Sequence, residues 1–333
     1  MKRSFWLIIP WALFVIAALG WIIYWNYLAD TAEQRVRAWA FEQNAQGGGA
    51  TFDRITRHGF PMLLRLELDG VAYASARGGW RVTTDRADLH VQVLNPQHVI
   101  LEAKAPLSVA RENGAVTNVS ADALIASLRT NNGALAVAGV EADNLVLDDP
   151  AEDGVLRAVK AVLNVRPDPR TRGAYQLAFD AQTLTLPRPV RSFETFGLDV
   201  PRLRAAIVIE QGAALLDASP EDPLGPWREA EGKLLFEAIE LNWGPLHTTG
   251  TGEGGLDAQR RLQGRLVLPV ERPAQIITAI ANGPNVDANA RRALGLLAAG
   301  YLVTGNEITL DIGAHDGVLS IEGLPVRPLP PVY

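Results

Sequence analysis

Beyond Gly49 the sequence alternates between apolar and polar residues with a period of two. The stretch LLRLELD at 63–69 places leucines on one side and charged residues on the other. The same alternation recurs near residues 89–93, 145–147, 174–186, 207–209, 266–268 and 308–312. Successive strand residues point to opposite faces of a sheet, so the pattern predicts half-buried strands. Parallel neighbours need long crossovers, so we expect a mainly β fold of long, curved, mostly antiparallel sheets.

A few helices and turns interrupt the predicted strands. The helices are expected at 121–129 after a Ser120 cap, at 272–281 with Pro273 in the first turn, and at 287–299. Asp316-Gly317 between two alternating runs predicts a hairpin. Prolines between 187 and 226 suggest two lobes that meet near 190–230.

An uncharged apolar run extends from Phe5 to Leu28, directly after Lys2 and Arg3. At 1.5 Å per residue it is long enough to cross a hydrocarbon core of ~30 Å. Aromatic rings lie towards both ends, as at the two interfaces of a membrane: Trp6, Trp11, Trp21, Tyr24, Trp25 and Tyr27. The basic residues before the run predict a cytoplasmic N-terminus, with the rest of the chain across the membrane.

The same run is open to a second interpretation, a cleaved signal peptide. Ala18-Leu19-Gly20 fits a small-x-small cleavage site after the apolar stretch 7–17. The continued apolar stretch 21–28 favours a retained anchor. The domains expected are therefore an anchor at 1–29, a juxtamembrane helix and glycine linker at 30–49, and an exported β-rich domain at 50–333. Val36, Trp39 and Ala40 can share one face of the juxtamembrane helix, which we expect to pack on its own domain.

Composition excludes several classes of protein. The chain has 333 residues, 48% of them hydrophobic, which is ample for a core. A net charge of -6 without a basic cluster argues against nucleic acid as a partner. The absence of cysteine excludes disulfides, thiolate nucleophiles and cysteine-ligated metals.

Motif searches favour neither an enzyme nor a cofactor or metal site. The segment 250–255, GTGEGG, has dinucleotide-binding spacing, but a strand-like run follows where a helix is needed, so we interpret it as a glycine-rich hairpin. The histidines form no i, i+3 or i, i+4 pair: His58, His90, His98, His247 and His315. The acidic turn around Pro150 lacks regular calcium-loop spacing and is expected to be solvated: Asp148, Asp149, Glu152 and Asp153.

Four short segments carry a family resemblance. They are HGFP at 58–61, LNVRP at 163–167 followed by YQLAF at 175–179, WGPL at 243–246 with LQGRL at 262–266, and DGVLS at 316–320 before the proline-rich end. Their order resembles the DUF2125 family of exported proteins of Gram-negative bacteria, and more weakly the AsmA-like envelope proteins. The resemblance implies a single-pass protein of the inner membrane, anchored through 5–28 with its body in the periplasm. It transfers no catalytic residue, and AsmA-like proteins hint at lipids.

The best candidate site is therefore an apolar sheet face. A curved sheet must cover that face with helices, another lobe or an apolar ligand such as a lipid. The speculative ligand-binding residues are Leu64, Leu66, Leu68, Leu89, Val91 and Val93. The alternative is a non-enzymatic structural or interaction protein of the cell envelope. Its proline-rich tail, 325–333, would dock on a partner or lie across its own sheet.

Overall fold

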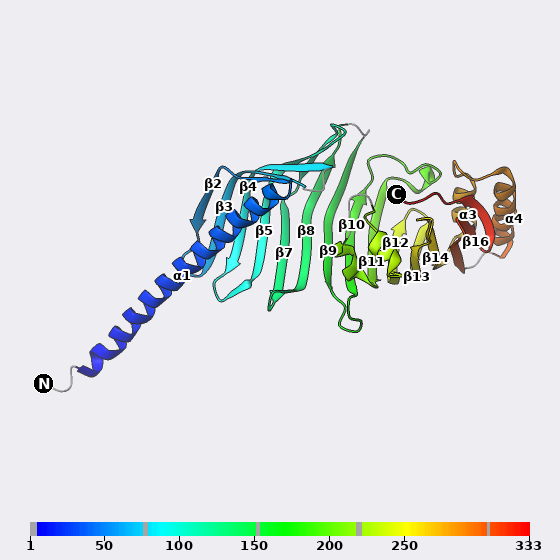
Figure 1. Cartoon of the computed structure of the whole chain (residues 1–333). Helices are drawn as coiled ribbons and strands as arrows, with labels where there is room; N and C mark the ends of the chain where they lie inside the picture. The colour runs from blue at the N-terminus through cyan, green and yellow to red at the C-terminus, as the bar shows by residue number, and fades with distance from the viewer. Residues whose placement is uncertain (1–4, 76–78, 151–153, 218–221, 305–306) are drawn as a thin grey trace. The chain divides into compact units, whose positions relative to one another are not determined.

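The computed structural model describes residues 5–75, 79–150, 154–217, 222–304 and 307–333 (Figure 1). The chain forms two compact units. Unit 1 comprises 1–119 and 123–134, and unit 2 comprises 120–122 and 135–333. Residues 190–230, where the sequence suggested a meeting of two lobes, lie inside unit 2.

Unit 1 contains an antiparallel sheet and one long helix. Strands β3, β4 and β5 form a meander, β1 and β2 pair with the free edge of β3, and β6 and β7 pair with β5. Their bounds are β1 Gly49–Thr51, β2 Arg54–His58, β3 Leu63–Ala74, β4 Trp80–Gln92, β5 Asn95–Arg111, β6 Val116–Ser120 and β7 Ala123–Asn131. The antiparallel sheet predicted from the alternation is confirmed.

Helix α1, Phe5–Ala45, is continuous through the boundary expected at 29/30. It contains, within Ile9–Ala45, a window of mean hydropathy 1.7 that is long and apolar enough to cross a membrane. Only 11% of that window is buried, unlike the core helix of a soluble protein. The helix ends before Gly47 at φ +86°, and the Asn44 side chain bonds both the N–H and the C=O of Ala50.

Unit 2 contains a second run of antiparallel strands, each pairing with the next along the chain. Their bounds are β8 Ala134–Asp148, β9 Val155–Pro167, β10 Tyr175–Thr185, β11 Asp199–Ile209, β12 Leu234–Trp243, β13 Leu246–Leu256, β14 Leu262–Val270, β15 Ile308–His315, β16 Val318–Ile321 and β17 Leu324–Pro328. Its helices are η1 Glu194–Phe196, η2 Gly212–Asp217, α2 Gly225–Glu229, α3 Pro273–Ala281 and α4 Ala288–Thr304.

The helix predicted at 121–129 is wrong, because residues 123–131 form strand β7. Leu124 and Leu128 fit one face of a helix, but they equally share one face of a strand. Residues 98–102 of β5 hydrogen-bond to β7, which decides between the two. Asn132 and Gly133, both at positive φ, then turn the chain.

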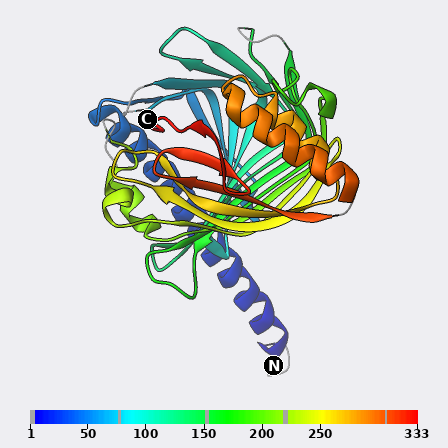
Figure 2. The same ribbon diagram turned by 90° about the vertical axis from the view of Figure 1, so that its right-hand side faces the viewer.

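The predicted helices at 272–281 and 287–299 and the Asp316-Gly317 hairpin are confirmed. Helices α3 and α4 pack with β14, β15 and β17 around one core (Figure 2). Ile277, Leu294 and Leu310 are fully buried in it. This core closes the C-terminal end of the unit 2 sheet.

Candidate functional site

The six candidate residues share one sheet face beneath α1. In the β3–β4 register Leu64 lies opposite Val91 and Leu66 lies opposite Leu89. Five of the six side chains are buried and Leu89 is partly buried, in a cluster with Trp25, Leu28 and Ala29 of α1. The face therefore forms a core with the protein's own helix at this position.

Polar contacts hold α1 on this face. Trp21 Nε1 donates to Pro61 O at 3.0 Å, and the Tyr24 hydroxyl donates to Val93 O at 3.0 Å. Trp25, which the sequence assigned to a membrane interface, is buried and packs edge-on against Phe60 at 5.5 Å. Helix α1 therefore packs against the His-Gly-Phe-Pro turn.

Steric crowding explains why a glycine occupies position 59 of that turn. Gly59 has φ +94°, and a Cβ there would lie 2.4 Å from the carbonyl oxygen of Leu63.

Ion pairs and apolar contacts also hold the later part of α1 on unit 1. The Arg57 guanidinium of β2 bridges Asp30 and Glu33 of α1 at 2.7 Å each. Val36 packs on the same core and Ala40 is buried, so the expected packing of the juxtamembrane helix on its own domain is confirmed.

The apolar face of unit 1 becomes exposed away from α1. Leu89 lies opposite Leu101, and Val99 of β5 lies opposite Leu128 of β7. Leu64 and Leu66 are fully buried, whereas Leu101 is 41% exposed and Leu128 is 45% exposed. The helix therefore covers only the part of this face nearest β3.

Unit 2 carries an apolar face of the same kind. One row crosses five strands through directly opposed residues, namely Val140, Leu163, Phe179, Ala205 and Ile239. A second row runs beside it, namely Ala138, Val165, Leu177, Ile207 and Phe236. We call these two rows the unit 2 apolar face. Val140 is 44% exposed, Leu163 is 37% exposed, and the remaining large side chains are partly exposed.

The residues between these rows, and the residues further along the strands in the same phase, point to the opposite face, which carries the charged side chains. The Lys160 ammonium pairs with Glu141, and Arg202 Nη2 lies 2.7 Å from Asp180 Oδ2. Arg265 Nη2 lies 2.6 Å from Asp311 Oδ2, and this guanidinium lowers the pKa of the Asp311 carboxyl. A charged face satisfied by its own ion pairs suits contact with water, so the sheet of unit 2 is amphipathic.

The glycine-rich segment 250–255 lies within strand β13, as the hairpin interpretation predicted. A Cβ at Gly250 would approach Leu268 Cδ2 to 2.4 Å, and one at Gly252 would approach Leu266 Cδ2 to 2.5 Å. These glycines therefore let the leucines of β14 lie across β13. The packing of β13 against β14 therefore accounts for these glycines without a role in binding a nucleotide phosphate.

The C-terminal tail packs on its own unit. Strand β17 pairs with β16, and Val332 N donates to Arg260 O at 2.9 Å. The Tyr333 hydroxyl donates to Asp222, which also accepts from Arg228 at 3.1 Å. The expectation that the tail lies on its own sheet is confirmed.

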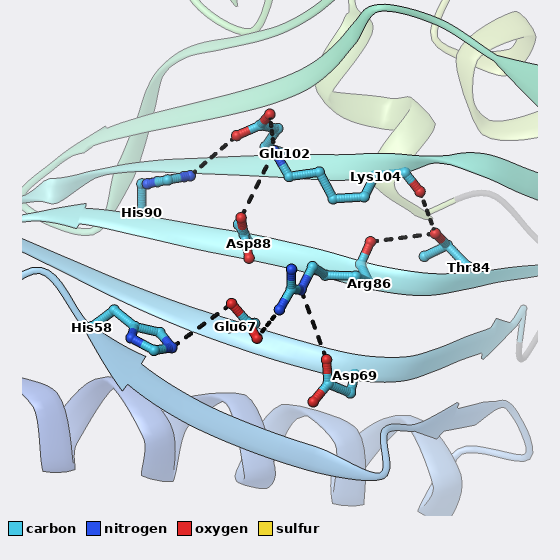
Figure 3. Close-up of polar contacts among 9 residues, drawn as sticks. All are labelled: His58, Glu67, Asp69, Thr84, Arg86, Asp88, His90, Glu102 and Lys104. Atoms are coloured by element: carbon cyan, nitrogen blue, oxygen red, sulfur yellow. Dashed lines mark hydrogen bonds and ion pairs between the residues drawn. The ribbon is translucent and has the colours of Figure 1, made fainter.

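The charged face of unit 1 contains a polar cluster (Figure 3). His58 Nε2 lies 3.7 Å from Glu67 Oε2, and Glu67 also pairs with the Arg86 guanidinium. This ion pair raises the pKa of Arg86. His58 thus belongs to a structural ion-pair network.

The other half of this cluster combines Asp88, His90, Glu102 and Lys104. One ligand atom from each of Asp88, His90 and Glu102 lies within 4.8 Å of the others. The helical histidine spacings i, i+3 and i, i+4 do not include this group, so the sequence analysis did not predict it. The Asp-x-His spacing on one strand was the available signal.

The remaining predicted positions do not join this cluster. His98 lies on β5 opposite Arg129, and His247 Nδ1 lies 3.3 Å from Asn242 Oδ1. His315 ends β15 in unit 2. In the acidic turn, Asp148 ends β8, while Glu152 and Asp153 lie outside the described residues.

Fold and site define a β-rich protein with an N-terminal helix apolar enough to span a membrane, and with amphipathic antiparallel sheets. The chain belongs to the family described as an uncharacterized protein conserved in bacteria (DUF2125), whose model matches residues 25–330. Searches of curated proteins and of solved structures found no match. The AsmA-like resemblance remains a prediction.

Proposed function

We propose that the protein is a membrane-anchored, non-enzymatic lipid-binding protein, and that the unit 2 apolar face receives an acyl chain. The observation that carries the proposal is the row from Val140 to Ile239, which is partly exposed while the other face of the same strands is charged. A contiguous exposed apolar surface of this kind marks a binding site.

The dimensions and chemistry favour a chain-like apolar ligand. Five strands about 4.8 Å apart give a row roughly 19 Å long. The row contains only aliphatic and aromatic side chains, so it offers no hydrogen bond to a polar solute. An extended acyl chain satisfies both conditions.

Helix α1 supports a location where lipids are available. We propose that it crosses the inner membrane once, with the N-terminus in the cytoplasm and both units in the periplasm. Its contacts with the sheet begin at Trp21 and Tyr24, so the part of the helix before Trp21 would lie in the membrane and unit 1 would lie directly beside the membrane surface.

A paired substitution on β10 tests the proposal. Phe179 points into the unit 2 apolar face, and its neighbour Ala178 points to the charged face. Mass spectrometry of lipid extracted from the purified full chain should show that Phe179→Asp loses bound lipid and that Ala178→Asp retains it. Circular dichroism checks the fold of each variant. Equal lipid content in the two folded variants, or none in the wild type, contradicts lipid binding on this face.

The alternative is a structural or interaction protein of the cell envelope. The observation that favours it is the exposed side chain of Phe41 near the end of α1. Nearby on the same helix, Trp39 stacks on Tyr73 with ring centroids 5.7 Å apart. Photo-crosslinking from position 41 in intact cells should then capture a protein partner. Recovery of uncrosslinked chain alone would exclude a partner at this position.

A further inference from the structure

Strands β4 and β5 bring three metal-ligating side chains together on the charged face of unit 1. Asp88 and His90 are two residues apart on β4, so their side chains project from the same face. Glu102 of β5 lies directly opposite Asp88 in the antiparallel register. Figure 3 shows the three side chains converging from adjacent strands.

Asp88 is a buried carboxylate that its neighbours compensate only in part. The residue is 3% exposed, and its Oδ1 atom has no hydrogen-bond partner. Lys104 Nζ lies 3.8 Å from Oδ2, which is longer than a hydrogen bond. Burying a carboxylate with so little compensation costs free energy, and a cation bound by this carboxylate would recover part of it.

We propose that Asp88, His90 and Glu102 bind a divalent transition-metal ion of the zinc type. An imidazole nitrogen with two carboxylate oxygens is a ligand set that Zn²⁺ accepts, with a fourth position left for water. Ca²⁺ and Mg²⁺ prefer oxygen ligands alone, so the histidine disfavours them. The ion braces β4 against β5 on the face opposite α1, separately from the apolar surface.

Lys104 is the internal competitor of this ion. Its ammonium pairs with Glu102 and lies near Asp88, so it offsets the negative charge at the oxygens that the metal needs. The Lys104 side chain is 41% exposed and can turn into solvent when the ion binds.

Zinc titration of the chelator-treated full chain, followed by calorimetry, tests the site. We expect the wild type to bind one equivalent and His90→Ala to bind at least ~10–100-fold more weakly, since losing a ligand costs no less than losing its supporting partner. His98→Ala, on β5 but outside the cluster, should match the wild type. Equal binding by wild type and His90→Ala, or none by the wild type, overturns the proposal.

Lys104→Met gives a second and opposite test. Removing the competing ammonium should tighten zinc binding about two- to fivefold, the scale of a partly exposed ion pair. Unchanged or weaker zinc binding would show that Lys104 does not compete with the ion for the oxygens of Asp88 and Glu102.

X-ray absorption of the zinc-loaded wild type gives a test that does not depend on any variant folding. It should show one imidazole among oxygen ligands, and two or more imidazoles would rule out this ligand set.

Discussion

At the scale of single residues, the aromatic side chains of α1 have two different environments. Trp25 is buried against Leu64 and Leu66, whereas Tyr27 is exposed two residues later. Sequence alone grouped both with a membrane interface, because amphipathic rings suit either place. Only the register of the helix on the sheet separates them.

We therefore predict that Trp25→Ala lowers the free energy of unfolding of unit 1 by about 3–5 kcal/mol, because it opens a cavity between helix and sheet. Tyr27→Ala should change it by less than about 0.5 kcal/mol. Hydrogen exchange of the β3 and β4 amides in the full chain measures both. Similar losses for the two variants would show that Trp25 does not hold the helix.

The tail contact predicts a dependence on pH. The Tyr333 hydroxyl and then Arg228 lower the pKa of the Asp222 carboxyl. A folded-state pKa below the unfolded value stabilises the fold at pH values above the unfolded pKa of about 3.9, and this stabilisation is lost as pH falls through the folded value.

The stability advantage of the wild type over Asp222→Asn should thus be complete near neutral pH and should shrink in acid. Chemical denaturation of the two chains, followed by circular dichroism at a series of pH values, measures this advantage. A difference that stays constant down to the lowest pH would exclude this carboxylate as the cause.

At the scale of elements, alternation predicted the strands well and failed for one segment. Residues 123–131 satisfy both a helical and a strand pattern, and long-range pairing with β5 decides between them. The same limit applies to the candidate metal ligands. Asp88 and His90 are visible as a period-two pair, but Glu102 joins them only through the β4–β5 register.

The glycines of β13 give a prediction at this scale. A Cβ at Gly252 would lie 2.4 Å from Arg265 O, whereas one at Gly254 would meet nothing closer than 3.7 Å. Gly252→Ala should therefore destabilise unit 2 by about 1–3 kcal/mol through overpacking, and Gly254→Ala should be tolerated. Thermal unfolding compares them. Equal transition temperatures would mean that β14 shifts without cost.

At the scale of the whole molecule, the sequence predicted the family, the apolar N-terminal helix and the antiparallel strands. It could not predict which part of the apolar face α1 covers, because that depends on how the helix lies on β3 and β4. The leucines chosen from the sequence are the covered ones. The exposed rows in unit 2 come from side chains opposed across five strands.

The fate of the N-terminus is a further test at this scale. Cleavage after Gly20 would leave Trp21, Tyr24 and Trp25 on the sheet, so packing alone is compatible with either form. We propose retention, and we expect the intact mass of the protein from membranes to include residues 1–20. A mature chain beginning at Trp21 would contradict retention and would show that the protein is exported without its membrane anchor.

Photo-crosslinking at neighbouring positions of β9 tests the central claim most directly. Leu163 points into the unit 2 apolar face and Asn164 to the charged face, and both are exposed. With a photoreactive residue at either position of the full chain in its native membrane, lipid adducts should form at 163 and not at 164. Adducts at both positions alike, or at neither, would contradict an acyl-chain site on this face.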